Sequence, residues 1–112
     1  MPILTLLALD AFVEIANQSG HRSIPLAELY RLPGDTPHQE FSLEPGDLIT
    51  AITIPRTPAR RSTYHKVRDR ASYAFALMSA AVALDMDRDT VRRARVALGG
   101  VATIPWRAVA AE

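Results

Sequence analysis

The chain has 112 residues, of which 48% are apolar, and its formal net charge at pH 7 is +1. This length suits one small domain or parts of two, and the nearly neutral charge gives no sign of a nucleic-acid or membrane partner. The sequence contains no cysteine, which excludes disulfides, thiolate nucleophiles and cysteine-ligated iron–sulfur or zinc sites within it and fits a reducing compartment.

The first residues are apolar but lack the features of a signal peptide. No basic residue precedes the apolar run, and Asp10 and Glu14 interrupt it. No segment reaches the roughly 18 consecutive apolar residues that a membrane-spanning helix needs. We therefore expect a soluble, cytoplasmic chain.

Two apolar runs open the chain, at residues 3–9 and 12–15. They fit either one helix or two strands, and their β-branched and aromatic side chains favour strands. The polar residues 17–20 that follow predict the tip of a hairpin.

The next segments predict a short helix and then a strand. Residues 23–30 suit one or two helical turns with Pro25 at the first helical position, where its missing N–H costs nothing. Residues 48–55 then predict a strand, which Pro55 ends because proline cannot donate to the sheet ladder.

The composition changes at residues 56–61, which hold three arginines and predict a linker or domain boundary. Residues 62–67 return to an extended pattern. On a strand Tyr64 and Lys66 point to one face and His65 to the other, because side chains alternate.

The remaining third predicts a hairpin and a helix start. Residues 79–86 and 94–98 each alternate with a period of two around a polar turn, so an antiparallel hairpin is favoured and its turn type stays open. Gly99 and Gly100 can adopt positive φ or allow a close backbone approach. Residues 104–108 predict the start of a helix led by its proline.

Several features could carry chemistry, and each has a plainer explanation. The basic residues 56–70 could bind an anion, but a solvated strand edge is favoured. Nucleic-acid binding is weaker still, because only Tyr64 is an aromatic among these charges. Asp85, Asp87 and Asp89 lack the glycine and glutamate of a calcium loop, so a solvated hairpin tip is favoured. We predict no catalytic residue and no metal ligand.

A family resemblance goes further than these single residues. It is carried by the spacing Y-x-K-x-x-x-R at Tyr64, Lys66 and Arg70, and by the segments ASYAFALMSAAVAL, ARVALGGVATIPWRA, IPLAELYRLPGDTP and LEPGDLITAITIP. With these motifs in this order over nearly the whole chain, the sequence resembles the FAD-binding subunit of the xanthine dehydrogenase and molybdenum hydroxylase family.

The resemblance implies an α+β fold of antiparallel β-hairpins with short helices. Residues 1–58 would be the end of an FAD-binding domain. Residues 59–112 would be the start of a CO dehydrogenase flavoprotein C-terminal domain, in which a three-stranded antiparallel sheet carries a helical bundle. The glycine-rich segments that hold the FAD diphosphate in that family, and its C-terminal helices, are absent from the sequence. We therefore expect a fragment of the subunit.

The resemblance also implies where the cofactor lies. A lysine at the position of Lys66 lies against the flavin in that family, and a backbone contact near Ile49 touches it. Arg70 would support the same edge. A cation there would stabilise negative charge on the reduced ring.

The implied function is electron transfer from iron–sulfur centres through FAD to an acceptor. The implied partners are a molybdopterin-binding large subunit and a small subunit with two [2Fe–2S] clusters. The chain alone would be inactive and would bind FAD weakly. The alternative is a non-catalytic protein-interaction module with a basic surface.

Overall fold

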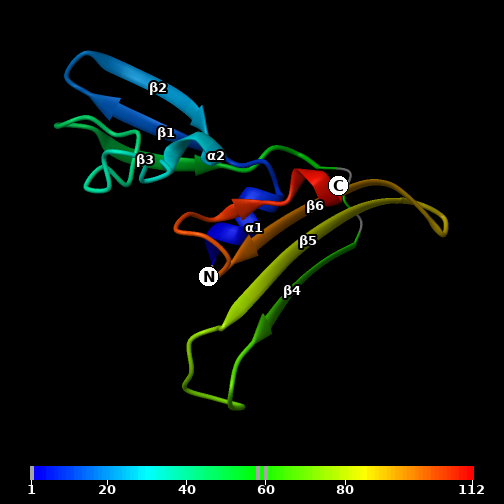
Figure 1. Cartoon of the computed structure of the whole chain (residues 1–112). Helices are drawn as coiled ribbons and strands as arrows, with labels where there is room; N and C mark the ends of the chain where they lie inside the picture. The colour runs from blue at the N-terminus through cyan, green and yellow to red at the C-terminus, as the bar shows by residue number, and fades with distance from the viewer. Residues whose placement is uncertain (1, 58, 60) are drawn as a thin grey trace.

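The computed structural model describes residues 2–57, 59 and 61–112 and holds two antiparallel sheets (Figure 1). The three-stranded sheet has the order β2-β1-β3 and consists of β1 (Phe12–Asn17), β2 (Gly20–Pro25) and β3 (Leu48–Thr53). The other has the order β4-β5-β6-β7 and consists of β4 (Arg61–Val67), β5 (Met78–Asp87), β6 (Thr90–Gly99) and β7 (Trp106–Arg107). The helices of the described residues are α1 (Pro2–Ala8), α2 (Leu26–Leu29) and the 3₁₀ helix η1 (Val109–Ala111). These elements confirm the predicted α+β fold class.

The first apolar run forms α1, so the prediction of a strand at residues 3–9 was wrong. Leu4, Leu7 and Ala8 are buried on one side of this helix. Their spacing of three and four residues is that of a helix with one apolar face. The burial of this face outweighs the weak preference of β-branched residues for strands.

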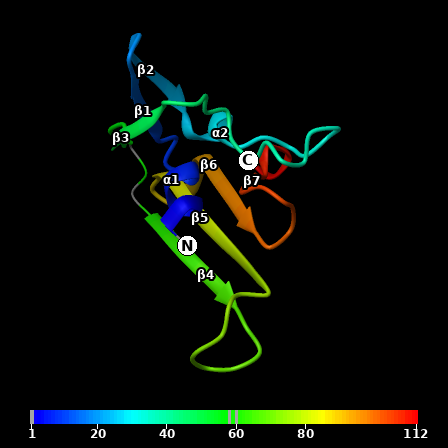
Figure 2. The same ribbon diagram turned by 90° about the vertical axis from the view of Figure 1, so that its left-hand side faces the viewer.

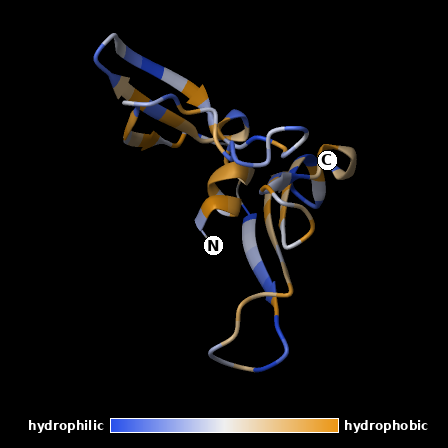
Figure 3. Ribbon diagram, turned by 60° about the vertical axis from the view of Figure 1, so that its left-hand side comes forward, coloured by the Kyte–Doolittle hydropathy of each residue, from blue (hydrophilic) through white to orange (hydrophobic). Residues whose placement is uncertain are grey.

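Helix α1 lies between the two sheets (Figures 1 and 2). It packs on β5 and β6 of the four-stranded sheet and also contacts α2. Figure 3 shows that it is apolar over most of its length, with sheets on two sides. The main core therefore forms around this helix.

Small residues line the face of β5 and β6 on which α1 packs. Ala81 and Ala97 pair across the two strands and are 2% and 0% exposed. A Cβ added at Gly99 would lie 2.7 Å from Leu4 Cδ1. Small side chains thus let the helix approach the sheet closely, and the predicted hairpin of β5 and β6 is confirmed.

Gly100 has the two properties that the sequence predicted for the glycine pair. Its φ is +83°, and a Cβ added there would overlap the carbonyl oxygen of Leu77. The chain therefore leaves β6 by passing directly over the start of β5. A residue with a side chain would clash at this crossing.

The structure also contains the two predicted hairpin turns, between β1 and β2 and between β5 and β6. Asn17 pairs with Gly20 at the tip of the β1–β2 hairpin, which confirms the hairpin tip at residues 17–20. In the β5–β6 turn, Arg88 has a φ of 54°. A positive φ at the first central residue is typical of the tight turns that join antiparallel strands.

Two predicted helices differ from the structure. The helix over residues 23–30 is reduced to α2, because Pro25 is the last residue of β2. The helix at residues 104–108 was wrong: Trp106 and Arg107 pair with Leu98 and Ala97 as β7. Pairing with β6 satisfies backbone groups that a helix of barely one turn would leave open.

The connection between the sheets was predicted as a linker at residues 56–61. Residues 58 and 60 lie outside the described residues. Thr57 Oγ1 accepts a hydrogen bond from the Ala59 N–H at 3.2 Å. No helix in the described part of the chain is long and apolar enough to cross a membrane.

Candidate functional site

Lys66 lies near the end of β4, the edge strand of the four-stranded sheet. It pairs with Ser79 of β5, and Tyr64 pairs with Ala81, so Lys66 and Tyr64 share the face that the strand pattern predicted. The Lys66 Nζ donates a hydrogen bond of 2.9 Å to the carbonyl oxygen of Ala74. The ammonium group is thereby directed at the loop that follows β4.

Arg70 lies in this loop, residues 68–77, which we call the β4–β5 loop. Its Nε donates to the carbonyl oxygen of Tyr73 at 3.1 Å. The Leu77 N–H donates to the carbonyl oxygen of Val67 at 2.9 Å and closes the base of the loop. The structure therefore brings Lys66 and Arg70 together, where they hold neighbouring carbonyl groups of one loop.

The β4–β5 loop presents two aromatic rings to solvent. Tyr73 is 95% exposed and Phe75 is 99% exposed, and Tyr73 has a φ of 55°. The sequence pattern alone did not indicate a role for these rings. Their position in an alanine-rich segment directly after the basic residues is a signal that could have identified them.

Ile49 lies on β3, the edge strand of the other sheet, where it pairs with Ile15 of β1. Figures 1 and 2 show β3 and the β4–β5 loop at different ends of the molecule. The structure therefore does not bring Ile49 to Lys66. As an edge strand, β3 leaves part of its backbone N–H and C=O groups available to a ligand.

The carboxylate of Asp47, which accepts several hydrogen bonds, fixes the turn that leads into β3. Asp47 Oδ1 accepts hydrogen bonds from Asn17 Nδ2 at 2.9 Å and Arg22 Nη1 at 3.1 Å. Its Oδ2 accepts from the Glu44 N–H at 2.9 Å and from Arg22 Nη2. The Asp47 side chain is 0% exposed, and the hydrogen bonds from Arg22 lower the pKa of Asp47 to about 2. The start of β3, and with it Ile49, is thus firmly positioned.

Tyr64 of the Y-x-K spacing is also held from the neighbouring strand. A hydrogen bond with the Ser79 side chain is the main cause that lowers the pKa of the Tyr64 phenol. Tyr64 also lines a cavity of about 180 Å³ between α1, β4 and β5. It belongs to the contact between the helix and the sheet.

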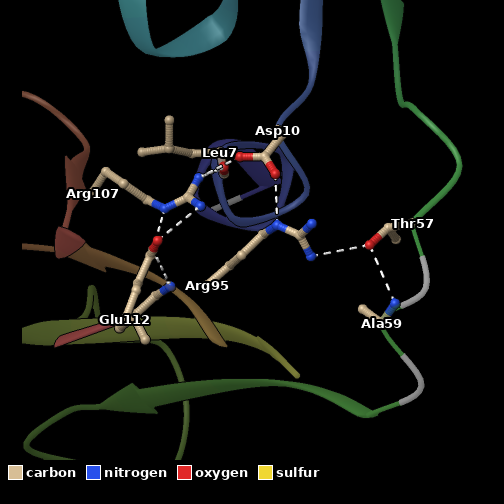
Figure 4. A network of polar contacts seen from close by, with 8 residues as sticks. Leu7, Asp10, Thr57, Ala59, Arg95, Arg107 and Glu112 are labelled. Atoms are coloured by element: carbon tan, nitrogen blue, oxygen red, sulfur yellow. Dashed lines mark hydrogen bonds and ion pairs between the residues drawn. The ribbon is translucent and has the colours of Figure 1, made fainter. Parts of the chain in front are cut away.

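A network of charged side chains lies where α1, β6 and β7 meet (Figure 4). Arg107 Nη1 donates to Asp10 Oδ1 and to the carbonyl oxygen of Leu7, both at 2.7 Å. Arg107 also pairs with Glu112, whose Oε1 accepts the Val96 N–H at 2.8 Å. Burial alone would raise the pKa of Glu112, but the bonds from Arg107 and Val96 lower it. Sequence reasoning missed this network, because its members are far apart in the chain.

The metal-binding potential of the site is limited. Within residues 2–57, 59 and 61–112, no group of three or more histidine, aspartate or glutamate side chains is placed to hold a metal ion. Groups that can meet a ligand include Lys66 at the end of β4, the exposed rings of Tyr73 and Phe75 in the β4–β5 loop, and the backbone edge of β3.

Two family models match the chain. The model described as the FAD binding domain in molybdopterin dehydrogenase matches residues 2–57. The model described as the CO dehydrogenase flavoprotein C-terminal domain matches residues 62–112. The chain belongs to the FAD-binding subunits of the molybdopterin dehydrogenase family.

Curated relatives agree with this family. The chain is 52% identical over 105 residues to the aldehyde oxidoreductase FAD-binding subunit PaoB of Escherichia coli, covering 93% of this chain and 32% of that protein. It is 31% identical over 112 residues to the glyceraldehyde dehydrogenase medium chain of Sulfolobus acidocaldarius, covering 100% of this chain and 37% of that protein. The chain thus spans about a third of the length of these relatives.

Solved structures share the fold. The reconstituted CO dehydrogenase from Oligotropha carboxidovorans matches with a TM-score of 0.79 and 29% identity, covering 99% of this chain and 37% of that chain. The predicted family is therefore confirmed, and FAD is the cofactor of the intact subunits in it. The roles of Lys66, Ile49 and Arg70 stay predictions.

Proposed function

We propose that this chain supplies part of the FAD site of a molybdopterin-dependent oxidoreductase. The observation that carries the proposal is the β4–β5 loop, which presents the exposed rings of Tyr73 and Phe75. Lys66 and Arg70 hold its backbone by hydrogen bonds to the carbonyl oxygens of Ala74 and Tyr73. This loop lies in a chain that matches both family models in order. The complete subunit would pass electrons from iron–sulfur centres through FAD to an acceptor.

The residues present fit a flavin ring system. A flat ring can stack on the exposed ring of Tyr73 or Phe75, and aromatic pairs prefer such offset or edge contacts. The backbone edge of β3 at Ile49 can bond a polar group of the same cofactor. Because Ile49 and Lys66 lie on different sheets, we assign them to separate parts of one extended ligand.

Bound FAD would supply the redox chemistry, accepting and donating electrons. The chain's contribution is electrostatic and steric. The Lys66 ammonium would face the negative charge that the ring gains on reduction, while Arg70 would keep the loop in place through Tyr73. Neither residue needs to transfer a proton.

The wider assignments belong to the same proposal. Residues 1–58 would form the end of the FAD-binding domain and residues 59–112 the start of the flavoprotein C-terminal domain. The partners would be a molybdopterin-binding large subunit and a [2Fe–2S] small subunit, in the cytoplasm. The family match and the names of the relatives, which are FAD-binding subunits or medium chains, support this assembly.

The test compares the FAD affinity of the unaltered chain with that of a Lys66→Met variant. The quenching of flavin fluorescence on binding measures each affinity. We expect Lys66→Met to weaken FAD binding about tenfold, which is about 1.4 kcal/mol. Arg61→Met is the matched control, because Arg61 is an exposed cation on the same strand. We expect its affinity to equal that of the unaltered chain. Equal affinities for all three proteins would contradict the assignment of Lys66.

A further inference from the structure

Arg95 has a charged side chain that is buried on the face of the four-stranded sheet covered by α1. It lies on β6, two residues before the fully buried Ala97, and its side chain is 7% exposed. Burying a guanidinium is costly unless ion pairs and hydrogen bonds compensate it. The partners of Arg95 therefore decide what it does.

These partners lie at one end of the three-stranded sheet, where the first residue of β1 pairs with the last residue of β3. Arg95 Nε is 2.6 Å from Asp10 Oδ2, and Asp10 lies between α1 and β1. Arg95 Nη1 donates to Thr57 Oγ1 at 3.1 Å, and Thr57 follows β3. One guanidinium thus holds both the point where the chain enters that sheet and the point where it leaves, as Figure 4 shows.

A second arginine reinforces one of these two points. Arg107 of β7 bonds the other oxygen of Asp10, so this carboxylate lies between two guanidinium groups of the four-stranded sheet. The Arg107 side chain is 20% exposed. Arg107 has no hydrogen bond with Thr57 in the described structure, so Arg95 is the residue that holds both the entering and the leaving segment.

The apolar contact between the two sheets runs through two short helices. Helix α1, which has 7 residues, packs on β5 and β6, and the 4-residue helix α2 connects it to β1 and β2. Hydrophobic contact is non-directional, whereas a guanidinium with two fixed partners sets both distance and angle. Movement between two units is expected unless their interface is large and apolar.

We propose that Arg95 is a positioning residue that fixes the three-stranded sheet relative to the four-stranded sheet. It would thereby set the separation of the β3 edge at Ile49 and the β4–β5 loop at Lys66. This consequence rests on the proposed function, in which both places contact one FAD. The fixed orientation itself is a property of the chain without the cofactor.

The experiment measures the distance between the sheets directly. The chain has no cysteine, so Ser19→Cys in the exposed β1–β2 turn and His65→Cys on the exposed strand β4 introduce two unique sites for spin labels. Double electron–electron resonance then gives the distribution of distances between the labels. We expect Arg95→Met to make this distribution about twice as wide, or to shift its mean.

Two further variants sharpen the result. Arg92→Met is the matched control, because Arg92 lies on the same strand and pairs with Asp87 at the exposed hairpin end. We expect it to leave the distribution unchanged. Thr57→Val removes one acceptor of Arg95 with little change in volume, and we expect an intermediate broadening. If Arg95→Met fails to fold, the Thr57→Val variant still tests the proposal.

Each outcome has one meaning. If Arg95→Met and Thr57→Val lower the melting temperature but leave the distance distribution of the folded protein unchanged, Arg95 is only structural and the proposal is overturned. FAD titration of the unaltered chain and of Lys66→Met separates the two proposals. Broadening together with an FAD affinity that is insensitive to Lys66→Met would contradict the proposed function and leave the positioning role standing.

Discussion

At the scale of single residues, the chain uses charged side chains mainly to hold backbone in place. Lys66 and Arg70 both donate to carbonyl oxygens of the β4–β5 loop. Asp47 collects donors from two strands and a turn. Each of these groups fixes a segment whose backbone or neighbouring side chains could then meet a ligand.

The ionised Asp47 side chain makes the stability of the fold depend on pH in the acidic range. Its pKa falls from 3.8 to about 2 on folding, so its contribution is fully present above about pH 4 and is lost as the pH falls towards 2. We expect Asp47→Asn to lower the melting temperature at pH 6 and to have much less effect at pH 2. Thermal melts from pH 6 to pH 2 measure this difference.

The control for this prediction is Asp35→Asn, since Asp35 is an exposed residue of the connection between α2 and β3. We expect its melting curves to follow those of the unaltered chain at every pH. An Asp47→Asn variant that loses the same stability at pH 6 and pH 2 would show that the charge of Asp47 is not what the fold uses.

Only part of the candidate site could be predicted from its residues. The family motif led to Lys66 and Arg70, and the structure brings these two together. The pairing of Arg95 with Asp10 could not be predicted, because it depends on how β6 packs against the end of α1. Local patterns carry no information on such distant partners.

At the scale of elements, the period of the apolar residues was more informative than residue preferences. The alternation in β5 and β6 predicted their hairpin correctly. It did not reveal which face is covered, because the buried face carries alanines and the larger Val82 and Val96 lie on the other. At α1 the helix was an open alternative, and residue preferences wrongly favoured strands. Strand β7 was missed because two residues are too few to show a period.

The crossing of two segments at Gly100 offers a test at this scale. We expect Gly100→Ala to lower the free energy of unfolding by about 2 kcal/mol or more, because it adds backbone strain and a clash with the Leu77 carbonyl. Gly46→Ala, at a φ of +91° with open space around it, should cost only the strain, about 1 kcal/mol. Urea denaturation measures both, and equal losses would show that the clash is relieved.

At the scale of the whole molecule, α1 joins the two sheets. Leu4 is 0% exposed and lies in the core that includes residues of both sheets. We expect Leu4→Ala to lower the free energy of unfolding by about 2–5 kcal/mol. The exposed Thr5→Ala should stay within about 0.5 kcal/mol. A cost below about 1 kcal/mol for Leu4→Ala would mean that the sheets are stable without the helix.

The placement of α1 also has a consequence for synthesis on the ribosome. The chain is made from its N-terminus, so α1 is complete long before Gly99, against which Leu4 packs, has been added. Contacts between residues so distant in sequence form late, because a long loop must close first. We therefore expect the apolar face of α1 to stay uncovered until β5 and β6 have been made. Helix α1 is thus made before the strands that cover its apolar face.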